Sequence, residues 1–128
     1  MISLRATLLV FTIAAMVACA GNPQRHLLSV AVAPSTASAQ DFPNGQVPFT
    51  AVGSFDKSPS PATLNPAVWD AFPIPNPPDA VSIDQNGVAQ CKAGFTGTVS
   101  LRGGQFQCGP TPTSACKLIY GIAQLTCS

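Results

Sequence analysis

The sequence predicts an all-β fold, a two-sheet sandwich of about seven short strands. Its 128 residues are enough for one domain with its own core. Thirteen Pro and ten Gly, with many Val, Thr and Ser residues, favour strands and turns over helices. Short apolar segments alternate with turn residues, and no amphipathic helical pattern follows the N-terminal apolar stretch. We therefore expect strands packed in two facing layers.

The N-terminal residues predict export from the cytoplasm. Arg5 precedes the apolar stretch ATLLVFTIAAMVA, which has the length of a signal peptide and is short for a membrane span. Signal peptidase could accept the small residues over 18–20 or, well beyond the apolar stretch, those over 37–39. The third alternative is cleavage directly before Cys19.

The segment MVAC, residues 16–19, resembles the lipobox of bacterial lipoproteins, where a cysteine is lipidated and becomes the first mature residue. The alternative is that Cys19 is discarded with the signal peptide. Both alternatives leave an even set of four cysteines, which suits an oxidising compartment. We expect a signal peptide over 1–18, a lipidated tether over 19–26 and a sandwich domain over 27–128.

A lipidated Cys19 implies a location in the cell envelope, with the protein anchored to a bacterial membrane. Two or more acyl chains on one cysteine give a stable anchor, because each buried methylene contributes about 0.8 kcal/mol. Ala20, rather than Asp, follows the cysteine. In lipoproteins of bacteria with two membranes, this residue is compatible with passage to the outer membrane.

The first predicted strand is LLSVAVAP, in which Leu28, Val30 and Val32 alternate on one face and Pro34 ends the strand. The next turn-rich segment leads to VPFTAVGSF, a second strand with Phe49 on its buried face. The following segment, DKSPSPATLNP, is predicted to be a loop with a short extended piece near its end.

The only Trp lies in the short apolar stretch AVWDAF. A large ring in such a position is usually a core anchor, so Trp69 is predicted to lie between the layers. The alternative is an exposed aromatic shelf for a ligand, formed by Trp69, Phe72 and the Pro-rich segment that follows. That segment, PIPNPPD, cannot be helical.

The strongest local pattern is a hairpin formed by AVSID, the Asn-Gly turn QNG and VAQC. Two further strands follow in TGTVSLRG and CKLIYGIAQLTC, the second marked by Leu118, Tyr120 and Ile122. The segment between them, GGQFQCGPTPTSAC, is predicted to be a long connection.

The order of these pieces resembles the bacterial Ig-like domain, group 2, over about residues 27–127. The matching pieces are the strand ending at Pro34, FTAVG over 49–53, VW over 68–69, VSIDQNGVA over 81–89, GTVSL over 97–101 and the closing strand over 121–126. The resemblance implies an Ig-like sandwich found in adhesins, surface proteins and envelope lipoproteins.

With this strand order, the cysteines can be paired as a hypothesis. Cys91 ends the strand after the Asn-Gly turn, at the level where the final strand ends, so we expect Cys91 to pair with Cys127. Cys108 and Cys116 would then close the connection between the last two strands. Four thiolates holding zinc are disfavoured, because no close C-x-x-C pair occurs.

Composition and residue types exclude several function classes. Only 9% of residues are charged and no basic cluster occurs, so nucleic acid is not an expected partner. The only histidine, His26, falls in the expected tether, which leaves Ser, Cys or Thr nucleophiles without a base. Asp84 and Asn86 could ligate calcium, but such residues usually serve their own turn. We expect no enzyme activity, no cofactor and no metal.

The expected function is therefore a structural or adhesive one at the cell envelope, with the membrane contacted through Cys19 and a protein or polysaccharide as partner. Two alternatives remain open. The first is a small-ligand or carbohydrate-binding module that uses the aromatic shelf. The second is a secreted inhibitor that uses the loop between Cys108 and Cys116.

Overall fold

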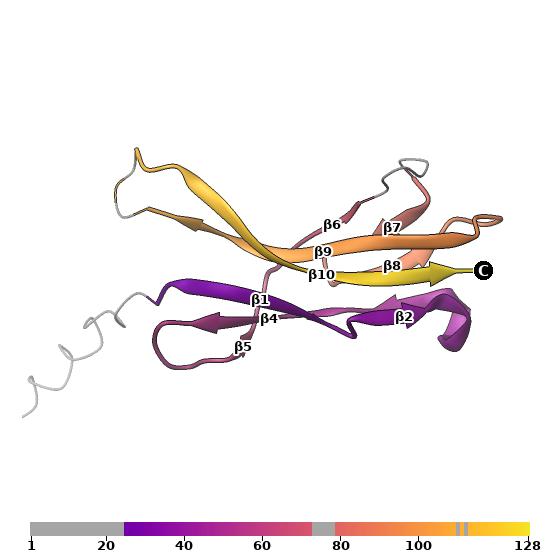
Figure 1. Ribbon diagram of the computed structural model, residues 1–128, viewed down its shortest axis with the longest axis horizontal. Helices are drawn as coiled ribbons and strands as arrows, with labels where there is room; N and C mark the ends of the chain where they lie inside the picture. Colours follow the sequence, from indigo (N-terminus) through magenta and orange to yellow (C-terminus); the bar gives the residue numbers. More distant parts are fainter. Residues whose placement is uncertain (1–24, 73–78, 110, 112) are drawn as a thin grey trace, which may run out of the picture.

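The computed structural model describes residues 25–72, 79–109, 111 and 113–128, and this part of the chain is nearly all β (Figure 1). The strands are β1 Leu27–Ala33, β2 Thr36–Ser38, β3 Gln46–Pro48, β4 Thr50–Phe55, β5 Ala62–Thr63, β6 Val68–Phe72, β7 Val81–Ile83, β8 Val88–Cys91, β9 Gly97–Cys108 and β10 Cys116–Cys127. Two single-turn 3₁₀ helices, Ala39–Asp41 and Pro43–Gly45, lie between β2 and β3. The predicted all-β sandwich is confirmed.

The strands form two layers. One layer has the order β2, β10, β9, β6. The other contains two hydrogen-bonded groups, β1-β4-β5 and β3-β8-β7, which are joined because only Phe49 separates β3 from β4. The Phe49 N–H donates to the Gly87 carbonyl at 2.8 Å and continues the ladder across this break.

The division of strands between the layers is immunoglobulin-like. An Ig constant-type domain places its first, second, fifth and fourth strands in one sheet and its third, sixth and seventh in the other. Here β1, β3 with β4, β8 and β7 form the first set, and β6, β9 and β10 form the second. The predicted seven strands correspond to these, whereas β2 and β5 are short additions.

Strand β2 was not predicted, and it explains how the first strand contacts both layers. After Pro34 the chain crosses from the layer of β1 to the other layer, where β2 runs parallel to β10. In this register Ala37 lies beside Leu125. The Gln124 N–H also donates to the Ser35 carbonyl at 2.9 Å. A sequence segment rich in turn residues therefore adds an edge strand to the β10 layer.

The core consists of two clusters of buried residues. The larger contains Val32, Ala39, Val47, Phe49, Ala80, Val81, Ala89, Val99, Leu101, Ala123, Leu125 and Cys127. The smaller contains only Leu27, Ala51 and Leu64. Trp69 packs against both clusters, so its ring connects them.

Two details of the strand predictions were wrong. The first strand buries Leu27 and leaves Leu28 63% exposed, because a bulge between Leu27 and Ser29 shifts the alternation by one residue. Strand β9 also continues through the Gly103-Gly104 pair to Cys108, where the sequence predicted a long connection. Both glycines are buried in paired strand, because β6 and β10 flank them closely.

The molecule is elongated, and its two ends differ (Figure 1). We call the end that contains the start of β1 and the β9–β10 hairpin the tether end. The opposite end contains the C-terminal residue Ser128 and Cys91, and we call it the distal end. No helix among the described residues is long and apolar enough to span a membrane.

Candidate interaction surfaces

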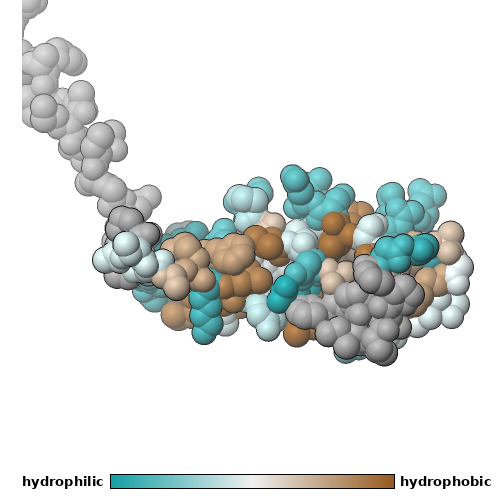
Figure 2. Space-filling view, turned by 90° about the horizontal axis from the view of Figure 1, so that it is seen from above, coloured by the Kyte–Doolittle hydropathy of each residue, from teal (hydrophilic) through white to brown (hydrophobic). Residues whose placement is uncertain are grey.

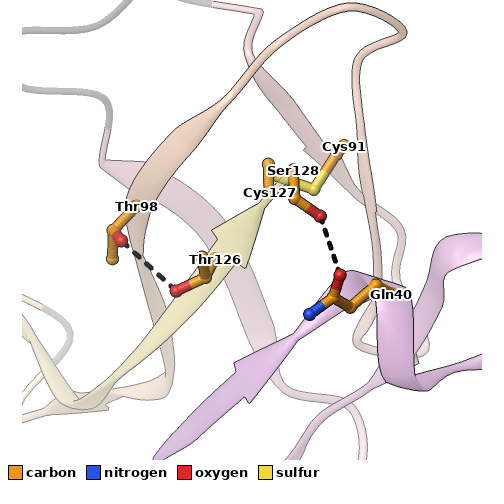
Figure 3. The surroundings of a disulfide bond; sticks show 6 residues. All are labelled: Gln40, Cys91, Thr98, Thr126, Cys127 and Ser128. Carbon is orange, nitrogen blue, oxygen red and sulfur yellow. Dashed lines mark hydrogen bonds between the residues drawn. A yellow bond between two sulfur atoms is a disulfide. The ribbon is translucent and has the colours of Figure 1, made fainter.

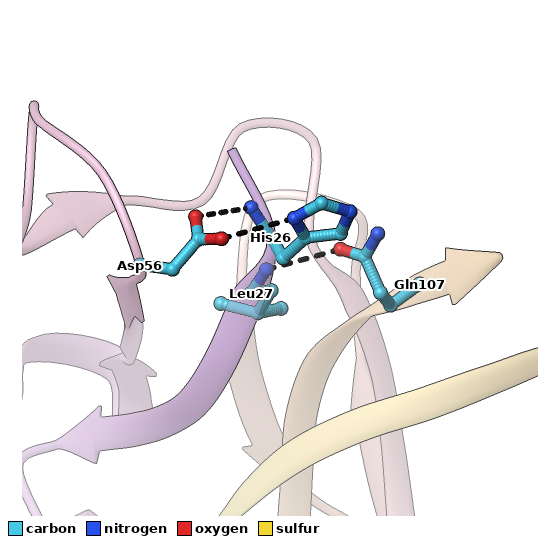
Figure 4. A network of polar contacts seen from close by, with 4 residues as sticks. All are labelled: His26, Leu27, Asp56 and Gln107. Carbon is cyan, nitrogen blue, oxygen red and sulfur yellow. Dashed lines mark hydrogen bonds and ion pairs between the residues drawn. The ribbon is translucent and has the colours of Figure 1, made fainter. Parts of the chain in front are cut away.

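At the tether end, His26 is fastened to the domain by Asp56 (Figure 4). The His26 backbone N–H donates to Asp56 Oδ1 at 2.7 Å, and its ring Nδ1 lies 3.0 Å from Asp56 Oδ2. The Asp56 N–H donates back to the His26 carbonyl at 3.0 Å. These hydrogen bonds from His26 lower the pKa of Asp56 below its usual value. His26 therefore belongs to the folded domain, and its predicted place in a free tether is wrong.

Arg25 also contacts the domain. Its guanidinium lies over the Phe55 ring, 3.8 Å from the centroid, and donates to the Pro59 carbonyl. Next along the chain after His26, the Leu27 N–H donates to the Gln107 side-chain oxygen at 3.1 Å, which joins β1 to the end of β9 (Figure 4). The described chain thus enters the sandwich beside the β9–β10 hairpin, and the expected tether shortens to 19–24.

Trp69 lies against two glycines. A Cβ added at Gly103, its cross-strand partner on β9, would lie 2.4 Å from Trp69 Cζ3. One added at Gly87 would lie 2.9 Å from Trp69 Cζ2. The half-buried ring therefore packs on backbone from β9 and from the β7–β8 turn. This geometry fits the predicted core anchor better than a ligand shelf, whose Pro-rich part over 73–78 lies outside the described residues.

The outer face of the β6, β9 and β10 strands is apolar over much of its length. We call it the outer apolar face, formed by Val68, Phe106, Leu118, Tyr120 and Ile122. Phe106 is 56% exposed, Ile122 52%, Tyr120 43% and Val68 38%, while Leu118 is half-buried. Hydrophobic residues gather on this side of the molecule in Figure 2. The sequence pattern predicted the final strand, but it did not predict that Leu118, Tyr120 and Ile122 of this strand point outward.

One ion pair borders the outer apolar face. Arg102 on β9 donates from Nε to Asp70 Oδ1 at 2.8 Å, and from Nη2 to Asp70 Oδ2. The Asp70 carboxylate raises the pKa of Arg102, so this guanidinium keeps its charge. Arg102 also lies over the Tyr120 ring, 5.0 Å from the centroid. The pair holds the arginine along the sheet surface, at the edge of the exposed Tyr120 and Ile122.

A disulfide closes the distal end (Figure 3). Cys91, the last residue of β8, is bonded to Cys127, the last residue of β10, with 5.9 Å between their Cα atoms. Beside it, the Ser128 hydroxyl donates to the Gln40 side-chain oxygen at 3.4 Å. The bond links the two layers, and it joins the pair expected from the strand order.

The second disulfide joins Cys108 and Cys116, which face each other as the last and first residues of β9 and β10. It is also the pair expected from the strand order. Within the tip it closes, the Thr111 and Ser114 hydroxyl oxygens lie 2.6 Å apart, and the Ser114 N–H donates to the Thr111 carbonyl at 2.9 Å. The hairpin tip is thus tied at its base and lies at the tether end.

The distal end carries an open hollow of about 320 Å³. Phe42 and Phe95 line it together with the polar side chains of Gln90 and Lys92. Lys92 is held by Asp79 at 2.7 Å, and this hydrogen bond is the main cause of the lowered pKa of Asp79. The sequence reasoning missed the hollow, because its residues come from three separate segments.

The remaining predicted sites have structural roles or fall outside the described residues. Asp84 Oδ1 accepts hydrogen bonds from the N–H groups of Asn86 and Val88, both at 2.9 Å, and so serves its own turn. Among the described residues, no group of three or more His, Cys, Asp or Glu side chains is arranged to hold a metal ion. Cys19 lies outside the described residues.

No protein-family model matches this chain, and no curated protein matches it at a significant level.

Proposed function

We propose that this protein is an exported, lipid-anchored and non-enzymatic Ig-like module of the bacterial cell envelope, with a structural or adhesive role toward a protein or polysaccharide. Cys19 is the proposed lipidation site. The motif order given above supports membership of the bacterial Ig-like group 2 family, which we propose on that basis. The single observation that carries the function is the clamp of His26 on Asp56, which fixes the chain to the domain seven residues after Cys19.

The position of this clamp determines which end of the domain lies nearer the membrane in the proposed arrangement. A tether that enters beside the β9–β10 hairpin keeps that hairpin on the membrane side, and the distal end then faces away from the membrane (Figure 1). The distal hollow, with Phe42, Phe95 and the polar Gln90, is therefore the surface best placed to meet a partner. The tip between Cys108 and Cys116 is less favourably placed for an inhibitor, because it lies at the tether end.

A non-enzymatic role is supported by the environment of the only histidine. His26 is engaged with an exposed carboxylate on the outside of the domain, in contact with backbone groups of Asp56 and away from the hollow. General-base catalysis needs a base within hydrogen-bond reach of a nucleophile or substrate in a sheltered site. The contacts of His26 instead serve to hold the start of β1.

The test is the mass of the mature N-terminus, measured on protein isolated from bacterial membranes. We expect a chain that begins at Cys19 and carries acyl groups, and that partitions into a detergent phase. The matched control is Cys19→Ser, which should appear in the aqueous phase while Trp69 fluorescence stays unchanged. If the chain that retains Cys19 has an N-terminus without acyl groups, lipid anchoring is contradicted.

A further inference from the structure

We propose that the outer apolar face, formed by Val68, Phe106, Leu118, Tyr120 and Ile122, rests on the surface of the membrane that holds Cys19. This inference deepens the proposed function and rests on it, since it names the surface that the anchored domain contacts. The observations that carry it are the continuity of the face, the point where the tether enters and the charges at that end.

The outer apolar face is continuous because the strand register aligns its members. Phe106 is paired with Leu118, and the next pair on the same face joins Gly104 to Tyr120. Val68 on β6 also lies beside Gly104, so the side chains flanking this glycine are Val68 and Tyr120. An apolar strip thus runs from the hairpin tip toward the middle of the sheet. Exposed strips of this kind mark contact with a protein or a membrane.

The tether keeps the strip within reach of the membrane. Cys19 and Arg25 are six residues apart, so even a fully extended chain between them spans only about 20 Å. Leu27 donates to Gln107, the residue after Phe106. A lipid on Cys19 therefore holds the hairpin close to the bilayer surface for the lifetime of the anchor. A tilt of the domain toward its β10 layer brings the apolar strip against the bilayer and leaves the distal end facing away from it.

The charges at the tether end suit anionic headgroups. Lys117 precedes Leu118 on β10, and Arg25 and Lys57 lie at this end in the layer of β1 and β4, beside Asp56. Asp70, which borders the outer apolar face, is paired with Arg102. Asp79, in contrast, belongs to the distal end with Lys92. Cationic side chains beside exposed apolar ones favour binding to a negatively charged lipid surface. Aromatic rings such as those of Phe106 and Tyr120 are also favoured at the boundary between water and lipid.

The test uses the mature chain with Cys19→Ser, so that no acyl group contributes, and vesicles of phosphatidylethanolamine and phosphatidylglycerol. We expect the chain to sediment with these vesicles and Phe106→Ser to lower its partition coefficient about tenfold, as expected for the loss of one buried aromatic side chain. The matched control is Leu28→Ser, which removes a 63% exposed side chain from β1 in the other layer. It should leave the partition coefficient unchanged.

Three outcomes would overturn the inference. They are a chain that does not sediment with the vesicles, an equal effect of Phe106→Ser and Leu28→Ser on the partition coefficient, and binding of the outer apolar face to a second copy of the chain. The last outcome is detected by sedimentation velocity without lipid, as a dimer that Phe106→Ser converts to monomer. Acylation of Cys19 with no intrinsic vesicle binding would refute the inference alone, whereas vesicle binding by a chain that is never acylated would refute lipid anchoring alone.

Discussion

The two halves of the sandwich are held together differently. The distal half contains most of the larger core cluster, with twelve buried residues, and the disulfide between Cys91 and Cys127. The tether half has a cluster of three buried residues, hydrogen bonds between His26 and Asp56 and a disulfide at the tip of an exposed hairpin. The distal half thus relies on apolar burial, and the tether half on local contacts and on the Trp69 ring.

The largest expected difference between the halves is the loss of unfolding free energy when a core leucine is replaced by alanine. Leu101 is fully buried in the larger cluster and Leu64 is 7% exposed in the smaller one. Leu101→Ala should lower the free energy of unfolding by about 4 kcal/mol, and Leu64→Ala by about 2 kcal/mol, because a site near the edge can relax around the lost volume. Urea unfolding followed by far-ultraviolet circular dichroism measures both. Equal losses would mean that the smaller cluster is as tightly enclosed as the larger.

The disulfide of the distal half should also stabilise the fold more than the disulfide of the tether half. They close chain segments with sequence separations of 36 and 8 residues. The chain-entropy estimate is about 4 kcal/mol for Cys91–Cys127 and about 2.5 kcal/mol for Cys108–Cys116. We expect the Cys91→Ser, Cys127→Ser double variant to melt at a lower temperature than the Cys108→Ser, Cys116→Ser double variant. The reverse order, measured by calorimetry, would show that the hairpin tip controls unfolding.

The junction between the halves can be tested at Gly103. Gly103→Ala should cost about 1–3 kcal/mol, because its Cβ would overlap the Trp69 ring unless the ring moves. In a Trp69→Phe background the smaller ring leaves more room, so the same substitution should cost less. A double-mutant cycle by urea unfolding, followed by circular dichroism, measures this coupling. If the losses of unfolding free energy from Gly103→Ala and Trp69→Phe simply add in the double variant, the contact between Gly103 and the Trp69 ring is contradicted.

The smallest expected effects are pH-dependent and come from two exposed carboxylates, one at each end. The pKa values of Asp56 and Asp79 are both lowered in the folded state. Each therefore stabilises the fold above its usual pKa of about 3.8, and this contribution is lost as the pH falls through the lowered value. Asp56→Asn and Asp79→Asn should each make the decrease in stability between neutral pH and pH 3 smaller. The effect should be small, because both carboxylates are exposed to water. Thermal melts between neutral pH and pH 3 measure this slope, and a steeper acid slope in either variant would contradict it.

Local patterns in the sequence were enough for the hairpin of β7 and β8. The turn between them depends on neighbours only: Gly87 has a φ of +83°, a conformation that favours glycine, and Asp84 accepts the N–H groups of Asn86 and Val88. The disulfide pairs could be inferred once the strand order was assumed, since Cys91 and Cys127 both end strands at one level. These features were predictable because their causes lie within a few residues or in the topology.

The length of β9 was not predictable, because its cause is not local. Gly103 and Gly104 look like a loop in the sequence, but one lies under Trp69 and a Cβ on the other would lie 2.2 Å from the Ile119 carbonyl oxygen. The outer apolar face was hidden for a related reason. On β10 the residues alternating with Tyr120 and Ile122 are also small or apolar, so periodicity alone could not tell which set is buried.

The parallel pairing of β2 with β10 has a mechanical consequence. With the proposed anchor at Cys19 and a proposed partner at the distal end, tension would pull on the chain at Arg25, along the direction of β1. The hydrogen bonds of β1 with β4 run across that direction, and those of β2 with β10 do so in the other layer. Bonds in this orientation are loaded in shear and must rupture together, so a load applied between the two ends of the domain does not peel its strands apart one by one.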